Sequence, residues 1–219
     1  MGFDLPERIA DAGNAVMRDS IRVIDDFCPE VERVIASVHN AGFGTWRPNK
    51  GEVGSSVYEG MGFWGDHAWM LRSLAIVEGT HVLPNTTFFR VTRPGMERAY
   101  IHSDRETGAR TCVVYLSEHE DTYGTAFYRH RASGLTAMPT FAEMHGNPVF
   151  DQLKRDMVHG GDAEWEQVGF VHGALNRAVI FDAPLFHARI PLHGIGTNDT
   201  DSRLVWACHF YTPNTFPRE

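Results

Sequence analysis

This sequence of 219 residues has few cysteines, no long apolar run and no excess of basic residues. The three cysteines, Cys28, Cys112 and Cys208, are far apart and form no CxxC pair, so neither a disulfide framework nor a zinc knuckle is supported. The start, MGFDLPERIADAG, lacks the features of a signal peptide, and no apolar run nears the roughly 20 residues that span a membrane. We therefore expect a soluble, cytoplasmic protein without a membrane partner.

The charge balance argues against one further class of partner. The formal net charge is −8 and the pI is about 5.8. Proteins that hold nucleic acid by general electrostatics need an excess of Lys and Arg to neutralise phosphates. Such binding is not expected here, and the sequence leaves the oligomeric state undetermined.

The chain is long enough for one large domain, and no repeat or Pro/Ser linker divides it. We expect a single domain over residues 1–219 with helical support mainly in residues 1–80, after a short strand at SIRVIDDF. One helix should have Pro29 in its first turn and stop at Gly42, and a second should begin after a cap at Asp66 and end at Gly79.

From residue 85 onward the sequence pattern becomes typical of β-strands. Runs rich in β-branched and aromatic residues are separated by Gly, Pro, Asn and Asp, which predicts strands at TTFFRVT, RTCVVYLS, TAFYRH, WEQVGFV, RAVIFD and RLVWACHFY. The fold class is therefore α+β with a mostly β core over residues 85–212 and helices packed outside. A polar, partly helical insertion interrupts the core at about 131–165.

A His-x-Asp pattern just before one of these strands could bind a cation. Residues i and i+2 of an extended segment point to the same side, so His102 and Asp104 can share one ion. A second match, His119 and Asp121, lies in SEHEDTYG, which has the composition of a solvated loop. The pair at 102 and 104 is the preferred candidate.

A facial triad needs a second histidine beside such a pair, and it leaves three positions on the metal open. His187 follows the apolar strand AVIFD closely, while His193 in the PLHGIG turn is the alternative. Arg203 begins the next strand and could clamp a carboxylate bidentately, or form an ordinary salt bridge with an aspartate. The residues Arg203, Val205, Ala207 and His209 should share the inward face, and the competing partners for Arg203 are Asp182, Asp199 and Asp201.

The order of these motifs resembles a known superfamily. It runs from His-x-Asp to Tyr115 and Leu116 at the end of the next strand, then to a distal histidine, and then to an arginine before an alternating apolar strand. This order is similar to the Fe(II)/2-oxoglutarate dioxygenases, especially the prolyl-4-hydroxylase-like branch, over roughly residues 21–212. The phrases FYRHR and FDAPLFH further resemble an uncharacterised bacterial and phage subgroup.

The resemblance implies a double-stranded β-helix (jelly-roll or cupin-like) with His102, Asp104 and His187 as iron ligands. It implies that Arg203 and Tyr115 bind the far carboxylate of 2-oxoglutarate, with Tyr100 as a further candidate. The implied reaction uses Fe(II), 2-oxoglutarate and O2, hydroxylates a C–H bond and releases succinate and CO2. Asp104 favours hydroxylation, because halogenating relatives lack that ligand.

The substrate and two other function classes stay open at this point. A peptide or protein side chain is the first expectation for the substrate, followed by a small metabolite and a nucleobase. The aromatic segment at 43–72 could wall a substrate cleft. The alternatives are a cupin-like metal-binding protein with redox-neutral chemistry and a non-catalytic β-barrel interaction module.

Overall fold

Strands dominate the part of the chain that the structure describes. This computed structural model describes residues 20–46, 58–96, 100–119, 122–144, 148–159, 161 and 163–217. In chain order the elements are β1 (Ile21–Ile24), α2 (Val31–Ala41), β2 (Gly44–Trp46), β3 (Tyr58–Gly62), α3 (His67–Glu78), β4 (Leu83–Thr92), β5 (Arg110–Tyr115), β6 (Gly124–His130), α4 (Phe141–Met144), α5 (Pro148–His159), β7 (Trp165–His172), β8 (Ala178–Asp182), β9 (His187–Ile190) and β10 (Arg203–Tyr211).

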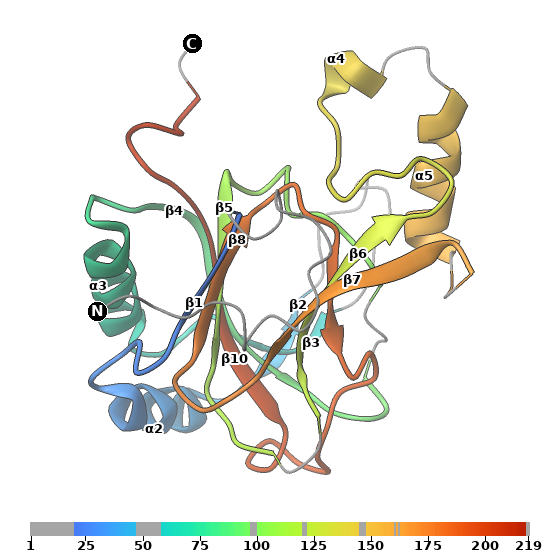
Figure 1. Cartoon of the computed structure of the whole chain (residues 1–219). Coiled ribbons are helices and arrows are strands. Elements are labelled where there is room, and N and C mark those ends of the chain that lie inside the picture. The colour runs from blue at the N-terminus through green and yellow to red at the C-terminus, as the bar shows by residue number, and fades with distance from the viewer. Residues whose placement is uncertain are drawn as a thin grey trace.

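Two antiparallel sheets face each other and form the barrel (Figure 1). The larger sheet has the order β1-β8-β5-β10-β4-β3-β2, and the smaller has the order β7-β6-β9. Side chains from both sheets meet between them in one apolar cluster that includes Tyr115, Phe127, Phe181 and Val205. This arrangement is the predicted double-stranded β-helix, with a mostly β core.

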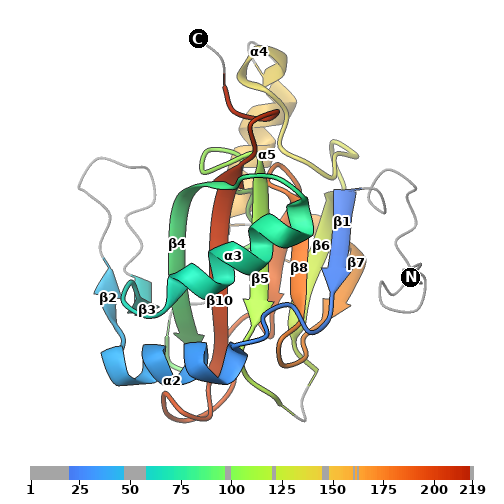
Figure 2. The same cartoon turned by 90° about the vertical axis from the view of Figure 1, so that its left-hand side faces the viewer.

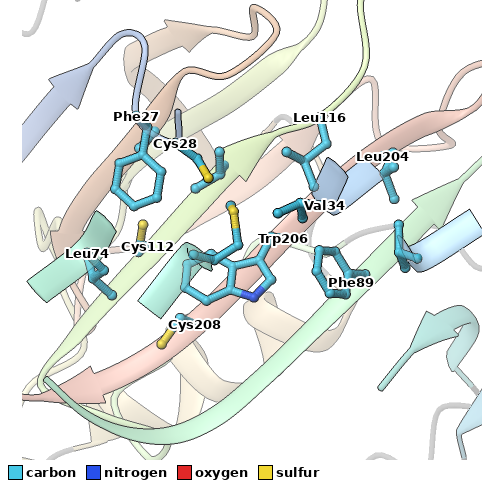
Figure 3. Packing of buried hydrophobic residues seen from close by; sticks show 14 of the residues in the cluster. Phe27, Cys28, Val34, Leu74, Phe89, Cys112, Leu116, Leu204, Trp206 and Cys208 are labelled. Atoms are coloured by element: carbon cyan, nitrogen blue, oxygen red, sulfur yellow. The ribbon is translucent and has the colours of Figure 1, made fainter. Parts of the chain in front are cut away.

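Two helices cover the outer face of the larger sheet. Figure 2 shows α3 crossing β4, β10 and β5, with α2 below it. The core beneath these helices contains Trp206, Phe89, Leu74 and all three cysteines, which are free and buried (Figure 3). Since Trp206 Nε1 donates to His67 Nδ1 at 3.0 Å, its buried N–H has the partner that burial requires.

The insertion packs on the other side of the molecule, against the outer face of the smaller sheet. Leu153 and Phe150 of α5 contact Trp165 and Phe186 in a third apolar cluster. His130 joins this helix to β6, because its Nε2 lies 2.9 Å from Asp156 Oδ2 and its Nδ1 lies 2.8 Å from Ser133 Oγ. The insertion is therefore part of the core packing.

The predicted strands and the two predicted helices are confirmed to within a few residues. The helix after Pro29 begins at Val31, and Gly42 and Gly79 end the two helices with φ of 77° and 65°. Asp66 occupies the cap position of α3, but its side chain makes no capping hydrogen bond. Its carboxylate instead lies 3.4 Å from Arg33 Nε of α2.

Three short strands were not predicted. β2 and β3 extend the larger sheet within the first third, which was expected to be mostly helical after its opening strand. β9, with the sequence HARI, is too short to show an alternating pattern. Within the described residues, no helix is long and apolar enough to cross a membrane.

Candidate metal centre

Two histidines are brought together by a single antiparallel bridge. His102 lies in the segment before β5, and His187 is the first residue of β9. His102 N donates to His187 O at 3.0 Å, and His187 N donates to His102 O at 2.9 Å. This exchange fixes the two backbones, and the imidazole centroids lie 4.4 Å apart.

Both imidazole rings are held in the same way. His102 Nδ1 lies 2.8 Å from the carbonyl oxygen of Tyr100, and His187 Nδ1 lies 2.9 Å from that of Leu185. A carbonyl can only accept, so Nδ1 carries the proton in each ring. In the neutral form of each ring, Nε2 therefore keeps a lone pair for a cation.

Asp104 completes the constellation. Its Oδ1 lies 3.6 Å from His102 Nε2, and its Oδ2 lies 3.3 Å from His187 Nε2. One donor atom from each of the three residues lies within 4.8 Å of the others. The Asp104 backbone is held by N–H donation to Ala183 O at 2.9 Å, which fixes the carboxylate beside the start of β9.

The Asp104 carboxylate is buried among donors. Thr111 Oγ1 donates to Oδ2 at 2.8 Å, and His209 Nε2 lies 3.3 Å from the same oxygen. Burial by itself would raise the pKa of Asp104, but His187 and His209 hold that pKa well below its usual range. The carboxylate stays charged at neutral pH.

This donor set fits a divalent first-row metal such as Fe(II) or Mn(II). Two imidazoles and one carboxylate form a facial triad that leaves open positions for other ligands. Asp104 and His187 are almost enclosed, with side chains 10% and 7% exposed, whereas that of His102 is 49% exposed. The centre is thus accessible on the His102 side.

Arg203 lies buried further along the same interior face. Its guanidinium is 5.7 Å from the centroid of the Tyr115 ring, and the Tyr115 hydroxyl is 2.8 Å from Thr125 Oγ1. Burial raises the pKa of Tyr115, so this hydroxyl keeps its proton. Arg203 Nε and Thr92 Oγ1, which come from residues opposite each other on β10 and β4, are buried without a hydrogen bond. Donors left in this state fit a bound carboxylate.

The three aspartates that could have competed for Arg203 all lie elsewhere. Asp199 pairs with Arg93, Asp182 lies 3.7 Å from Arg110, and Asp201 accepts from backbone N–H groups of its own turn. No carboxylate in the described part of the chain lies within ion-pairing distance of Arg203. An ordinary salt bridge therefore does not account for its burial.

Among the described residues, the donor cluster does not include the other sequence candidates. His193 is exposed in a turn, and the Tyr100 side chain is 54% exposed, although its carbonyl orients His102. His119 lies 2.9 Å from Ser117 Oγ, and its proposed companion Asp121 falls outside the described residues. The structure thus brings together His102, Asp104 and His187, with Arg203 and Tyr115 on the interior face.

Three residues of the interior were not singled out as site residues from the sequence. His209 was expected only to face inward, and it contacts Asp104. Arg90 of β4 and Arg189 of β9 also face the barrel interior, opposite Val205 and Thr125 respectively. The alternation of β4 could have revealed Arg90, and the i+2 spacing from His187 could have revealed Arg189.

The insertion also supports the site from outside. Phe186 N donates to Thr136 O at 2.9 Å, directly before His187. Arg105, the neighbour of Asp104, donates from Nη1 to Met138 O at 2.8 Å. The segment 136–138 thus braces the backbone next to two of the three candidate ligands.

Three solved structures illustrate the similarity of this architecture to known proteins. AviO1 from Streptomyces viridochromogenes Tue57 is 12% identical, with a TM-score of 0.53, and the match covers 91% of this chain and 93% of AviO1. HygX from Streptomyces hygroscopicus with iron bound is 10% identical over 90% of this chain and 83% of its own, with a TM-score of 0.50. The non-heme alpha ketoglutarate dependent carbocyclase SnoK from nogalamycin biosynthesis is 13% identical over 92% and 85%, with a TM-score of 0.50. At such identities the likeness establishes the fold.

At the level of sequence, one family matches. The comparison with curated proteins found no match. A family model described as a family of unknown function (DUF6445) matches residues 96–207, which include the His-x-Asp pair and His187. Because this match spans slightly more than half of the chain, the protein belongs to the family of unknown function DUF6445.

Proposed function

We propose that this protein is an Fe(II)- and 2-oxoglutarate-dependent oxygenase. The observation that carries the proposal is the pairing of a His-Asp-His constellation with a buried arginine on the same interior face. His102, Asp104 and His187 would hold the metal. Arg203 would bind the distal carboxylate of 2-oxoglutarate, with Tyr115 beside it.

The bound iron would supply the redox chemistry that activates O2 for oxidation of a substrate C–H bond. For hydroxylation, 2-oxoglutarate, O2 and a C–H bond are converted to succinate, CO2 and an alcohol. The chain's own residues orient the co-substrate and shield the interior from water. Phe127 and Phe181 lie beside the His187 ring, with centroid distances of 6.4 and 4.7 Å, so the wall next to His187 is apolar.

We further propose a branch of the superfamily and a product for the reaction. The motif order favours a prolyl-4-hydroxylase-like branch and therefore hydroxylation. SnoK, which shares the fold, is described as a carbocyclase, so product analysis must accompany any assay of turnover. The same metal centre could serve either outcome, because the outcome depends on where the substrate C–H bond lies.

Metal content and succinate formation together test this proposal. Purified protein should bind one Fe(II) or Mn(II) per chain and release succinate from 2-oxoglutarate in the presence of Fe(II) and O2. Asp104→Ala should lose both properties, while the exposed Asp151→Ala on α5 should keep both. Metal binding without any succinate, under all iron and oxygen conditions, would favour a cupin-like protein with redox-neutral chemistry.

A further inference from the structure

One half of the larger sheet has an inner face that does not take part in the packing between the two sheets. The apolar cluster between the sheets draws its strand residues from β1, β5, β6, β7, β8 and β10, and none of its described members comes from β2, β3 or β4. Figure 2 shows β2 and β3 at one edge of the larger sheet, next to β4. The inner face of these three strands therefore differs from the rest of the barrel interior.

Phe88 of β4 places an aromatic ring on this face beside the metal centre. It is opposite Ala207 of β10, which shares the inward face with His209. The Phe88 ring centroid is 6.0 Å from that of His209, and His209 Nε2 lies 3.3 Å from Asp104 Oδ2. Phe88 is only half-buried, although the next residue, Phe89 on the outer face, is completely buried in the core beneath the helices. The Phe88 ring is therefore accessible to a ligand near the candidate metal centre.

Three further rings continue this surface toward the edge of the sheet. Phe63 directly follows β3, and the register between β3 and β4 places it next to Phe88. Trp46 of β2 contacts both Phe63 and Tyr58 of β3, with ring centroids 6.5 and 5.4 Å apart. Tyr58 packs at 5.4 Å against the guanidinium of Arg90, which faces the barrel interior. Phe88, Phe63, Tyr58 and Trp46 thus form an aromatic strip across the inner face.

The aromatic strip is exposed to a degree that a packed barrel interior would not show. Trp46 and Phe63 are each 42% exposed, and Tyr58 is half-buried. Contiguous exposed apolar surface of this kind marks a ligand-binding groove or an interface. Because the strip begins at Phe88, beside His209, its continuity with the metal centre favours a ligand that also reaches the metal.

Geometry and charge restrict the kind of ligand that fits. Neighbouring strands are about 4.8 Å apart, so the strip extends over about 10 Å from β4 to β2, which suits a fused ring system. Aromatic side chains bind flat apolar rings through offset stacking and edge contacts. Arg90 already places a positive charge against the Tyr58 ring, which disfavours a cationic ligand on the same surface.

We propose that the aromatic strip binds the primary substrate, and that this substrate is a neutral small molecule with a flat, fused ring system. One end of the ring system lies on Phe88, where a C–H bond can reach the metal, and the other end lies against Trp46. This inference rests on the proposed function of the metal centre and assigns a substrate class to it. It favours a small metabolite over the peptide side chain that was the first expectation.

Binding of simple probes tests this inference without the substrate. The protein is loaded with Mn(II) and N-oxalylglycine, an analogue of 2-oxoglutarate, and is titrated anaerobically with 2-naphthalenemethanol by NMR. We expect one equivalent to bind, and we expect Mn(II) to enhance the relaxation of the ring protons relative to Zn(II)-loaded protein. N-acetylphenylalaninamide and methyl glucoside, which represent a peptide side chain and a sugar, should bind at least tenfold more weakly.

Substitutions show whether the probe lies on the aromatic strip. Phe88→Leu and Trp46→Leu remove a flat ring but keep an apolar side chain, so each should weaken binding of 2-naphthalenemethanol by about three- to tenfold. Trp46→Phe keeps a ring and should retain most of the affinity. The control is Ile76→Ala on α3, at a residue that is 71% exposed on the outer side of the larger sheet, and it should leave probe binding unchanged. All four variants should keep the Mn(II) and N-oxalylglycine affinities of wild type within about twofold.

The possible failures differ from one another. If N-oxalylglycine binds but 2-naphthalenemethanol does not, or if the two Leu variants bind this probe as tightly as wild type, the ring-binding inference is wrong and the oxygenase proposal stands. Tighter binding of either other probe overturns the substrate class. A wild-type dimer that Trp46→Leu converts to a monomer in sedimentation would make the strip a contact between two copies, which also overturns the inference. If N-oxalylglycine does not bind while 2-naphthalenemethanol binds as expected, only the oxygenase proposal fails.

Discussion

The Asp104 carboxylate is closely surrounded, because three side chains approach one of its oxygens. Thr111, His187 and His209 all lie within 3.3 Å of Oδ2. Groups that orient a metal ligand from outside the coordination sphere typically change metal affinity by about 10- to 100-fold when removed. Thr111 and His209 are not candidate ligands themselves, so substituting either residue tests whether it orients the Asp104 carboxylate.

We expect His209→Ala and Thr111→Val each to weaken Mn(II) binding by roughly tenfold without abolishing it. Both changes leave the three candidate ligands in place but remove a contact that orients the Asp104 carboxylate. Calorimetric titration of Mn(II) measures the effect, and exposed His81→Ala is the control. Complete loss of metal in His209→Ala would instead make His209 a ligand itself.

Replacing Arg203 by lysine separates the contribution of its charge from that of its guanidinium geometry. Lysine keeps the charge but loses the two parallel donors of the guanidinium. Losing a hydrogen bond to a charged group costs about 1.5 to 3 kcal/mol, so Arg203→Lys should raise the 2-oxoglutarate requirement roughly ten- to hundredfold. Succinate release at varied 2-oxoglutarate measures this change, and Mn(II) affinity should stay that of wild type. An unchanged requirement would remove Arg203 from the co-substrate site.

The Asp104 and His187 pair predicts how the stability of the metal-free protein depends on pH. Burial would lower the pKa of His187, but Asp104 raises it above the usual 6.5, while the pKa of Asp104 is held below 3.8. The raised histidine stabilises the fold below pH 6.5 and loses this effect as pH rises through its folded pKa. The lowered carboxylate stabilises the fold above pH 3.8 and loses this effect in stronger acid.

Metal-free wild type should therefore lose stability between pH 6.5 and 8.5 relative to His187→Ala, which lacks the pair. Urea unfolding of both proteins at the two pH values measures the difference. With saturating Mn(II) the trend should reverse, because the metal binds neutral imidazole and competes with the proton. A pH-independent difference between the two metal-free proteins would show that the pair does not titrate in this range.

Among the elements, α5 has the most specific attachment to the barrel. His130 is fully buried and reaches Asp156 and Ser133 with its two ring nitrogens, and Trp165 Nε1 donates to Asp156 O at 3.3 Å. The attachment lies at the end of β6, and the earlier β6 residues Phe127 and Thr125 are opposite His187 and Arg189. It should therefore affect stability more than the chemistry of the metal centre.

We expect His130→Ala to lower the free energy of unfolding by about 2 to 4 kcal/mol, because it leaves a cavity and removes a partner from the half-buried Asp156 carboxylate. Chemical denaturation measures the loss. The control His81→Ala, at an exposed position, should change stability by less than about 0.5 kcal/mol. A small loss in His130→Ala, comparable with that control, would mean that α5 is held mainly by its apolar residues.

Elements with strong local patterns were predictable from sequence, and elements without such a pattern were not. The runs TTFFRVT and RLVWACHFY carry alternation and β-branched residues, and they became β4 and β10. β2, β3 and β9 have the sequences GTW, YEGMG and HARI, which lack a run of β-branched residues, so these strands depend on pairing with neighbours. The region around β9 still allowed His187 to be selected, since it follows the apolar strand β8.

At the scale of the whole molecule, the order of the motifs along the chain was sufficient to predict the barrel. His102, Asp104, His187 and Arg203 follow one another with strands between them, and the double-stranded β-helix places these segments around one interior. Strand alternation could have assigned Arg90 and Arg189 to inward faces, but the sequence does not show which residues lie opposite them. These pairings depend on strand register, which one sequence does not specify.

The charge of the whole molecule contrasts with that of its interior. The chain carries a formal charge of −8, yet the buried Arg203 has no carboxylate within ion-pairing distance in the described part of the chain. An anionic ligand is therefore attracted at short range, where salt screens weakly, and not by the field of the whole protein. Binding of 2-oxoglutarate should consequently depend only weakly on ionic strength.

If His102, Asp104 and His187 hold a metal that binds 2-oxoglutarate, then 2-oxoglutarate binding requires that metal. This requirement can be measured directly. The measurement is anaerobic calorimetric titration of 2-oxoglutarate into wild type and Asp104→Ala, each with and without Mn(II). We expect one equivalent to bind wild type with Mn(II), and at least a tenfold loss of affinity when either Mn(II) or the Asp104 carboxylate is removed. Equal affinity with and without the metal, or no binding to the Mn(II)-loaded wild type, would contradict the assignment of this barrel as a 2-oxoglutarate-dependent oxygenase.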